Sequence, residues 1–128
     1  MSEAPLINTQ LIAELAEVLP PEELAATMAR FAKELVAKHS VLEGALSNHD
    51  CETMCRAAHA MTGTCGTFGA MRLSELCRDL LEKCEDKTAH NPADAACIAQ
   101  MDKRVTAINT CIDDTLKELE TALSEQGS

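Results

Sequence analysis

The chain has 128 residues, of which 46% are hydrophobic and only 2% aromatic, and its formal net charge is -10. This length favours a single domain, residues 1–128, with a core of aliphatic residues, methionine and cysteine. The acidic charge argues against nucleic acid and anionic membranes as partners, and no apolar run is long enough to span a bilayer, so a protein partner is expected.

Two amphipathic helices are predicted in the first part of the chain. The first is short: Asn8 or Thr9 can cap it, Pro20 ends it, and its apolar residues are Leu11, Leu15, Val18 and Leu19. Pro21 begins the second, and two glutamates follow it at the positive end of the helix dipole. The second helix extends to about residue 47, with apolar residues at Leu24, Met28, Phe31, Leu35, Leu42 and Leu46.

Three more helices are predicted after a polar break at residues 47–50. Asp50 can cap the third, and the fourth carries Leu73, Leu76, Leu80 and Cys84 and ends near residues 86–87. A loop over residues 88–92 separates it from the fifth, which Ala93 or Asp94 opens. The fifth helix has apolar residues at Ile98, Met101, Val105, Ile108, Ile112, Leu116, Leu119 and Leu123. No segment alternates with period two, so we expect an all-α fold, an up-down antiparallel four-helix bundle with a short extra N-terminal helix.

The third helix combines a histidine with an unusual number of glycines. At about 100° per residue, one stripe faces the core and contains Met54, Ala57, Met61, Cys65 and Phe68. His59 lies on the opposite, exposed face, and Gly63 and Gly66 share that face, where they would leave a smooth approach for another macromolecule. Gly69 is expected to end the helix as a left-handed cap. The alternative is that the glycines only allow close helix packing or an early helix end.

Seven cysteines occur, and the first ten residues lack the basic and apolar regions of a signal peptide. We therefore expect a cytoplasmic protein whose thiols are reduced and serve mainly as small core residues, as the apolar positions of Cys77, Cys84 and Cys97 indicate. A metal site from Cys51, Cys55 and His59 is a weaker alternative, because no CxxC or HxxxH pair is present. A redox sensor is another alternative, with Cys55 on the outward face as its first candidate.

The other histidines have ordinary settings. His39 flanks the apolar stripe of the second helix, and His49 and His90 fall in predicted loops. An exposed histidine such as His59 can bind a metal, transfer protons or act as a nucleophile, and its imidazole is mostly neutral at cytosolic pH.

The stretch from Ala58 to Glu82 carries a recognisable combination of residues: Ala58-His59, Gly63, Phe68-Gly69-Ala70, Leu73, Leu76-Cys77 and Leu80 to Glu82. It resembles the histidine-containing phosphotransfer (Hpt) domain, whose motif reads roughly AHxLKG, a short gap, (L/F)GA and then LxxLCxxLE. The predicted helices extend this resemblance over nearly the whole chain.

The resemblance implies a four-helix bundle with an exposed phosphoacceptor, which corresponds to His59. Members of this family take a phosphoryl group from an aspartyl phosphate on a receiver domain and pass it to another receiver, or reverse the transfer. The implied partners are response-regulator receiver domains and a hybrid sensor histidine kinase, with Mg²⁺ on the receiver and no cofactor or metal on this chain. No nucleotide-binding glycine loop or kinase signature occurs, so we expect a phosphocarrier and not a kinase. We also expect the protein to be a monomer.

The chain departs from the family motif at one position. The usual lysine, three residues after the histidine, is Thr62, and a hydroxyl offers only a neutral hydrogen bond where an ammonium would offset phosphoryl charge. Arg56, one turn before His59, could supply a cation or be an ordinary solvated side chain. We expect Arg56, Thr62, Gly63 and Gly66 to contact the phosphoryl group or the partner. The alternative function is a scaffold or inhibitor that binds a receiver without efficient transfer.

Overall fold

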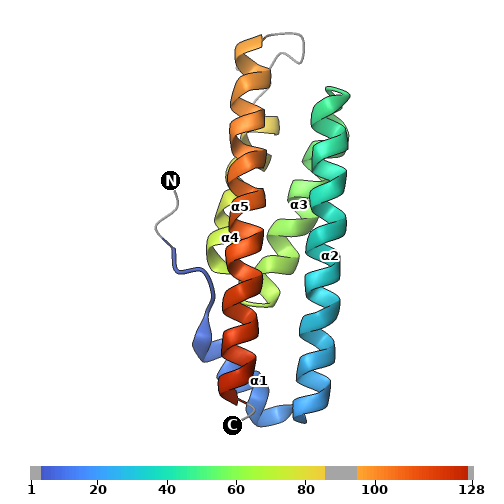
Figure 1. Ribbon diagram of the computed structural model, residues 1–128. Helices are drawn as coiled ribbons and strands as arrows, with labels where there is room; N and C mark the ends of the chain where they lie inside the picture. The colour runs from blue at the N-terminus through green and yellow to red at the C-terminus, as the bar shows by residue number, and fades with distance from the viewer. Residues whose placement is uncertain (1–3, 86–94, 127–128) are drawn as a thin grey trace.

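The computed structural model describes residues 4–85 and 95–126, and its regular structure is helical throughout these ranges. The helices are α1 (Thr9–Val18), α2 (Pro21–Ser47), α3 (Cys51–Thr67), α4 (Met71–Glu85) and α5 (Ala95–Gln126) (Figure 1). The predicted all-α fold is therefore confirmed. The predicted end of the fourth helix at residues 86–87, the loop at 88–92, His90 and the opening of the fifth helix at Ala93 or Asp94 lie outside the described residues, as does the side chain of Cys97.

Helices α1, α2 and α3 begin at residues that suit a helix N-terminus. The Asn8 side chain accepts a hydrogen bond from the backbone N–H of Leu11 at 3.1 Å, and α2 begins with Pro21 in its first turn. Asp50 caps α3 by accepting from the backbone N–H of Thr53 at 3.1 Å and from its hydroxyl at 2.6 Å. These bonds from Thr53 lower the pKa of the Asp50 carboxyl. All three predicted starts are confirmed.

Helices α2 to α5 run alternately in opposite directions and form a four-helix bundle (Figure 1). Each packs on the next in the chain, and α5 closes the ring against α2. The hairpin of α3 and α4 is much shorter than the pair of α2 and α5, which have 27 and 32 residues. Helix α1 lies at one end of the bundle, where α2 begins and α5 ends, and it contacts both (Figure 1).

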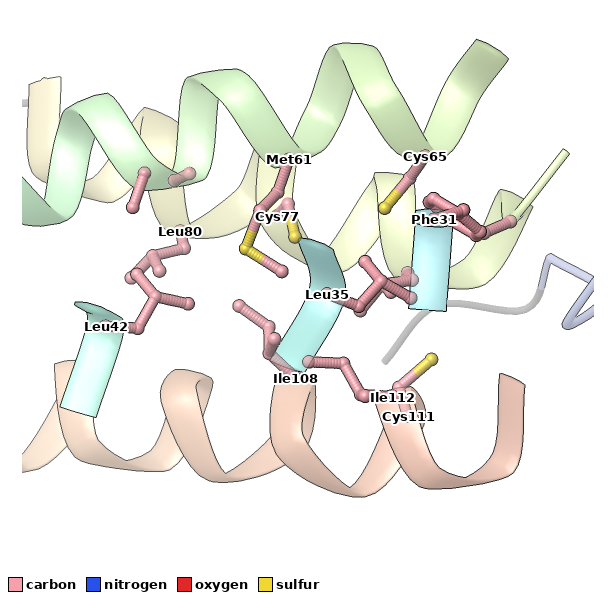
Figure 2. Close-up of a cluster of buried hydrophobic side chains, with 14 of the residues drawn as sticks. Phe31, Leu35, Leu42, Met61, Cys65, Cys77, Leu80, Ile108, Cys111 and Ile112 are labelled. Atoms are coloured by element: carbon pink, nitrogen blue, oxygen red, sulfur yellow. The ribbon is translucent and has the colours of Figure 1, made fainter. Parts of the chain in front are cut away.

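The core contains aliphatic and sulfur-containing side chains from all four long helices. Figure 2 shows part of it, with Leu35 and Leu42 from α2, Met61 from α3, Leu80 from α4 and Ile108 from α5. The rings of Phe31 and Phe68, the two phenylalanines of the chain, lie with centroids 4.8 Å apart. Burial of each large apolar side chain stabilises the fold by about 1.5 to 3 kcal/mol.

Two features of the predicted core were wrong or incomplete. Val18 does not face the core and is 74% exposed, whereas Ile12 is 0% exposed and anchors α1. The buried side of α1 follows the helical spacing of Ile12, Leu15, Ala16 and Leu19, and Val18 falls off this stripe. Ala58 is also fully buried beside the predicted stripe of α3, because α3 packs on both α2 and α4 and buries a wider arc than one stripe.

None of the helices in the described part of the chain is long and apolar enough to cross a membrane.

Candidate functional site on helix α3

His59 lies in the third turn of α3, and its side chain is exposed to solvent. The opposite side of the helix buries Met54, Ala57, Met61 and Cys65, which fixes how α3 is rotated on the bundle. The predicted outward orientation of His59 is confirmed. The imidazole is therefore carried on a rigid, well-anchored helix and is open to another macromolecule.

The three glycines of α3 and its C-terminal end serve different purposes. Gly63 and Gly66 are exposed on the same face as His59, and a Cβ atom at Gly63 would meet no other atom within 4 Å. A Cβ at Gly66 would lie 3.9 Å from the Ser74 hydroxyl oxygen, which is ordinary contact. Helix packing in the described structure therefore does not require glycine at either position.

Gly69 has a backbone conformation that favours glycine. Its φ of +78° is left-handed, as predicted for a C-terminal cap. The backbone N–H of Gly69 donates to Gly66 and that of Ala70 to Cys65, which is the Schellman pattern of a helix end. A Cβ here would also approach Leu11 at 3.0 Å and Asn8 at 3.3 Å, so the N-terminal segment and the α3 end meet at this glycine.

A hollow of about 330 Å³ lies beside His59. Cys55, Arg56 and His59 line it from α3, and Leu81 and Glu85 line it from α4. The fourth helix therefore contributes half of the surroundings of the histidine. Neither Leu81 nor Glu85 was identified from the sequence, because the hollow exists only once α3 and α4 are packed together.

Arg56 reaches the same hollow, but its guanidinium donates a hydrogen bond to the Glu52 carboxylate one turn earlier. Both side chains are largely exposed, and pairs of this kind contribute only about 0.3 to 0.5 kcal/mol. The pair is therefore weak enough to exchange for a stronger anionic partner. That Arg56 contacts a phosphoryl group stays a prediction.

The Thr62 hydroxyl is turned to its own helix and donates to the carbonyl of Ala58 at 2.8 Å. On the other side, the buried Ser74 of α4 donates its hydroxyl to the Thr62 carbonyl at 3.0 Å. Ser74 was not singled out from the sequence, although it directly follows a core leucine and precedes Cys77 by one turn. A contact between Thr62 and a phosphoryl group stays a prediction.

The structure does not show the exposed, low-pKa thiol that the redox-sensor alternative requires, nor the ligand cluster that the metal alternative requires among the described residues. Cys55 was expected to face outward, but it is half-buried and packs against the core, and burial raises the pKa of its thiol. Within residues 4–85 and 95–126, no three histidine, cysteine or carboxylate side chains are grouped so that they could hold a metal ion. Cys65, Cys77 and Cys84 are buried, as predicted.

Comparison with known proteins places this site in a family. A family model described as the Hpt domain matches residues 22–126. The crystal structure of histidine-containing phosphotransfer protein B (HptB) from Pseudomonas aeruginosa PAO1 is similar, with a TM-score of 0.62 and 22% sequence identity over 91% of this chain and 98% of that chain. No curated protein matches the sequence at a significant level. The family match spans helices α2 to α5 and includes His59, so this chain belongs to the Hpt domain family.

Proposed function

We propose that this chain is a reversible histidine phosphocarrier in a cytoplasmic multistep phosphorelay. His59 accepts a phosphoryl group from the aspartyl phosphate of one response-regulator receiver domain and passes it to another. A hybrid sensor histidine kinase supplies the relay. The observation that carries this proposal is an exposed His59 beside the open surface at Gly63 and Gly66, on a helix whose opposite side is buried, in a chain of the Hpt domain family.

The transfer is a single displacement at phosphorus. A neutral imidazole nitrogen of His59 forms the new N–P bond in line with the O–P bond of the aspartyl phosphate, which breaks and leaves the carboxylate. The electrostatic stabilisation and the Mg²⁺ come from the receiver. This chain positions the imidazole and, at the two glycines, leaves room for the surface of the receiver. The reverse transfer follows the same path.

Arg56 is the cation that lines the hollow beside His59. A phosphoryl group carries about -1.5 to -2 charges and three strong acceptor oxygens, and hydrogen bonds to charged groups are worth about 1.5 to 3 kcal/mol. This exceeds the worth of the exposed pair with Glu52, so the guanidinium transfers from Glu52 to the phosphoryl group once His59 is modified. Arg56 thereby takes the part of the lysine that Thr62 replaces.

The test is phosphoryl transfer from a panel of phosphorylated receiver domains, read by intact mass. The wild type should gain about 80 Da, the mass of one phosphoryl group, and lose it in acid. His59→Ala should show no gain, because the nucleophile is missing. His49→Asn is the matched control: His49 is exposed, and asparagine tolerates its positive φ of 52°, so transfer should be unchanged.

A receiver-binding scaffold is the second candidate function. It is favoured by Thr62, which replaces the family's lysine and whose hydroxyl already donates to the Ala58 carbonyl, so the positive charge at the hollow comes from Arg56. Receiver binding without any mass gain in the wild type would overturn the carrier role and support the scaffold. Thr62→Lys would then be the first variant to make, since gain of transfer would identify the missing ammonium as the cause.

A further inference from the structure

Two pairs of thiols bridge α3 and α4, which form the most extensive helix pair of the described structure. Toward the turn of the hairpin, Cys65 and Cys77 hydrogen-bond to each other, and this bond together with burial raises the pKa of Cys77. Figure 2 shows both residues in the core. Farther from the turn of the hairpin, the Cys84 thiol donates a hydrogen bond to the sulfur of Cys55. In this second pair, Cys55 lies one turn before His59 on α3.

The hollow beside His59 independently places Cys55 opposite the turn of α4 that contains Cys84. Cys55 lines this hollow together with Leu81 and Glu85 of α4, and these two residues flank Cys84 on the same side of that helix. The antiparallel course of the hairpin agrees, because Cys55 precedes Cys65 on α3 and Cys84 follows Cys77 on α4, so both lie farther from the turn than the first pair. The next cysteine along α3 in that direction therefore faces the next cysteine along α4.

The two pairs differ in access. Cys65 and Cys77 are both 0% exposed, so solutes do not reach them in the folded state. Cys55 is half-buried and forms part of the wall of the hollow, while Cys84 lies behind it in the core. A small oxidant can thus reach Cys55 first and leave Cys84 as the neighbouring thiol that completes the reaction.

We propose that Cys55 and Cys84 form a redox-active dithiol, which closes to a disulfide bond between α3 and α4 beside His59. A peroxide is the oxidant: hydrogen peroxide converts the Cys55 thiol to a sulfenic acid and is reduced to water. The Cys84 sulfur then attacks the Cys55 sulfur, the S–S bond forms, and the sulfenic oxygen leaves as a second water. Two thiols and one peroxide thus give one disulfide and two waters, and a dithiol reductant reverses the change.

Burial sets the speed of this reaction. It raises the pKa of the Cys55 thiol, so the reactive thiolate is scarce at neutral pH and oxidation is slow compared with that of a dedicated peroxide sensor. The hydrogen bond from Cys84 opposes this shift. The dithiol therefore responds to sustained exposure and not to brief pulses of oxidant.

The disulfide changes the surroundings of the phosphoacceptor, a consequence that rests on the proposed function. It ties the turn of α3 that precedes His59 to α4 and moves the Cys55 sulfur from the wall of the hollow toward the core. The hollow is where a partner approaches the imidazole, so phosphoryl transfer to the oxidised protein should be at least threefold slower.

The experiment is peroxide treatment of the full chain, followed by intact mass and peptide mapping. The wild type should lose about 2 Da, and the mapped bridge should join Cys55 to Cys84, while Cys65 and Cys77 react with an alkylating agent only after denaturation. A bridge between any other cysteines, or no mass loss in protein that circular dichroism shows to be folded, would overturn the proposal.

A variant separates the two steps. In Cys84→Ser the bridge cannot close, so the same treatment should add about 16 Da as a sulfenic acid on Cys55, which dimedone, a reagent selective for sulfenic acids, traps. Cys77→Ala, checked for folding, is the matched control because it removes a buried cysteine of the same helix pair; it should still lose about 2 Da. Absence of a trapped sulfenic acid in folded Cys84→Ser would also overturn the proposal.

Transfer rates distinguish the regulatory consequence from the proposed function. If the wild type accepts a phosphoryl group when reduced and equally fast when bridged, the regulatory consequence is overturned while the dithiol stands. If neither form accepts a phosphoryl group, the proposed function fails. The mass and peptide-mapping results still show whether Cys55 and Cys84 form the disulfide.

Discussion

Helix packing does not explain the glycine at position 63. This glycine is inside a helix, where glycine costs about 0.8 to 1 kcal/mol relative to alanine, and nothing in the described structure fills the space where its Cβ would lie. Its φ is not in the left-handed region, so the backbone does not need glycine either. The remaining explanation is the surface itself, one turn from His59.

The substitution Gly63→Leu tests this explanation. Leucine is the better helix former, so stability should rise by about 0.5 to 1 kcal/mol, while a large side chain beside His59 should slow phosphoryl transfer at least tenfold. Gly44→Leu is the matched control: Gly44 is also an exposed glycine within a helix, with nothing within 4 Å of its Cβ, but it lies on α2. Urea unfolding and transfer rates measure the two effects. Unchanged transfer in Gly63→Leu would refute the steric explanation.

The sequence predicted the orientation of His59 but not the partners of the side chains around it. Orientation follows from the spacing of the buried residues of α3, which is a regular property of one helix. Arg56 pairs with Glu52, and Thr62 pairs with a backbone carbonyl. The sequence offers each of these side chains several partners and does not decide among them. The hollow depends on residues of α4, and its shape follows only from the packing of two helices.

The junction between α3 and α4 shows how one element fixes another. Gly69 ends α3 in a left-handed conformation, its carbonyl accepts from the backbone N–H of Asn8 at 2.7 Å, and the backbone N–H of Arg72 donates to Pro5 at 3.0 Å. The Arg72 side chain donates to Ala4 at 2.8 Å. The start of α4 and the end of α3 are thus held by the segment that precedes α1.

The substitution Gly69→Ala should destabilise the protein by about 1 to 3 kcal/mol. The left-handed conformation costs a residue with a Cβ about 1 to 2 kcal/mol, and the Cβ would also lie 3.0 Å from Leu11 and 3.3 Å from Asn8. Gly66→Ala, three residues earlier, should instead stabilise by up to about 1 kcal/mol, because it has space and helical geometry. Urea unfolding followed by circular dichroism compares them. Equal stabilities would show that Gly69 is not a required cap.

The helix boundaries within the described residues were predictable because they depend on local chemistry. Asn8 and Asp50 accept from backbone N–H groups three residues later, Pro21 can only begin a helix, and Gly69 can end one. The face that α1 buries was not predictable in the same way. Its apolar residues allow more than one stripe, and the choice of Ile12 over Val18 is made by the surfaces of α2 and α5.

At the scale of the whole molecule, the unequal lengths of the helices explain the presence of α1. At about 1.5 Å per residue, α2 and α5 are about 40 and 48 Å long, whereas α3 and α4 reach only about 26 and 22 Å. The short hairpin therefore cannot cover the whole apolar side of the long pair. Helix α1 packs on α2 and α5 at the end of the bundle where α2 begins (Figure 1).

The substitution Ile12→Ala tests whether α1 is part of the bundle core. Ile12 is fully buried, and shortening it to alanine should cost about 2 to 5 kcal/mol, because burial is lost and a cavity remains. Val18→Ala on the same helix removes an exposed side chain and should change stability by less than about 0.5 kcal/mol. Thermal unfolding compares the two variants.

Because His59 lies on α3, folded Ile12→Ala should still accept a phosphoryl group at the wild-type rate. A small stability change in this variant would mean that α1 only rests on the surface of the bundle, and that α2 and α5 tolerate an uncovered apolar end.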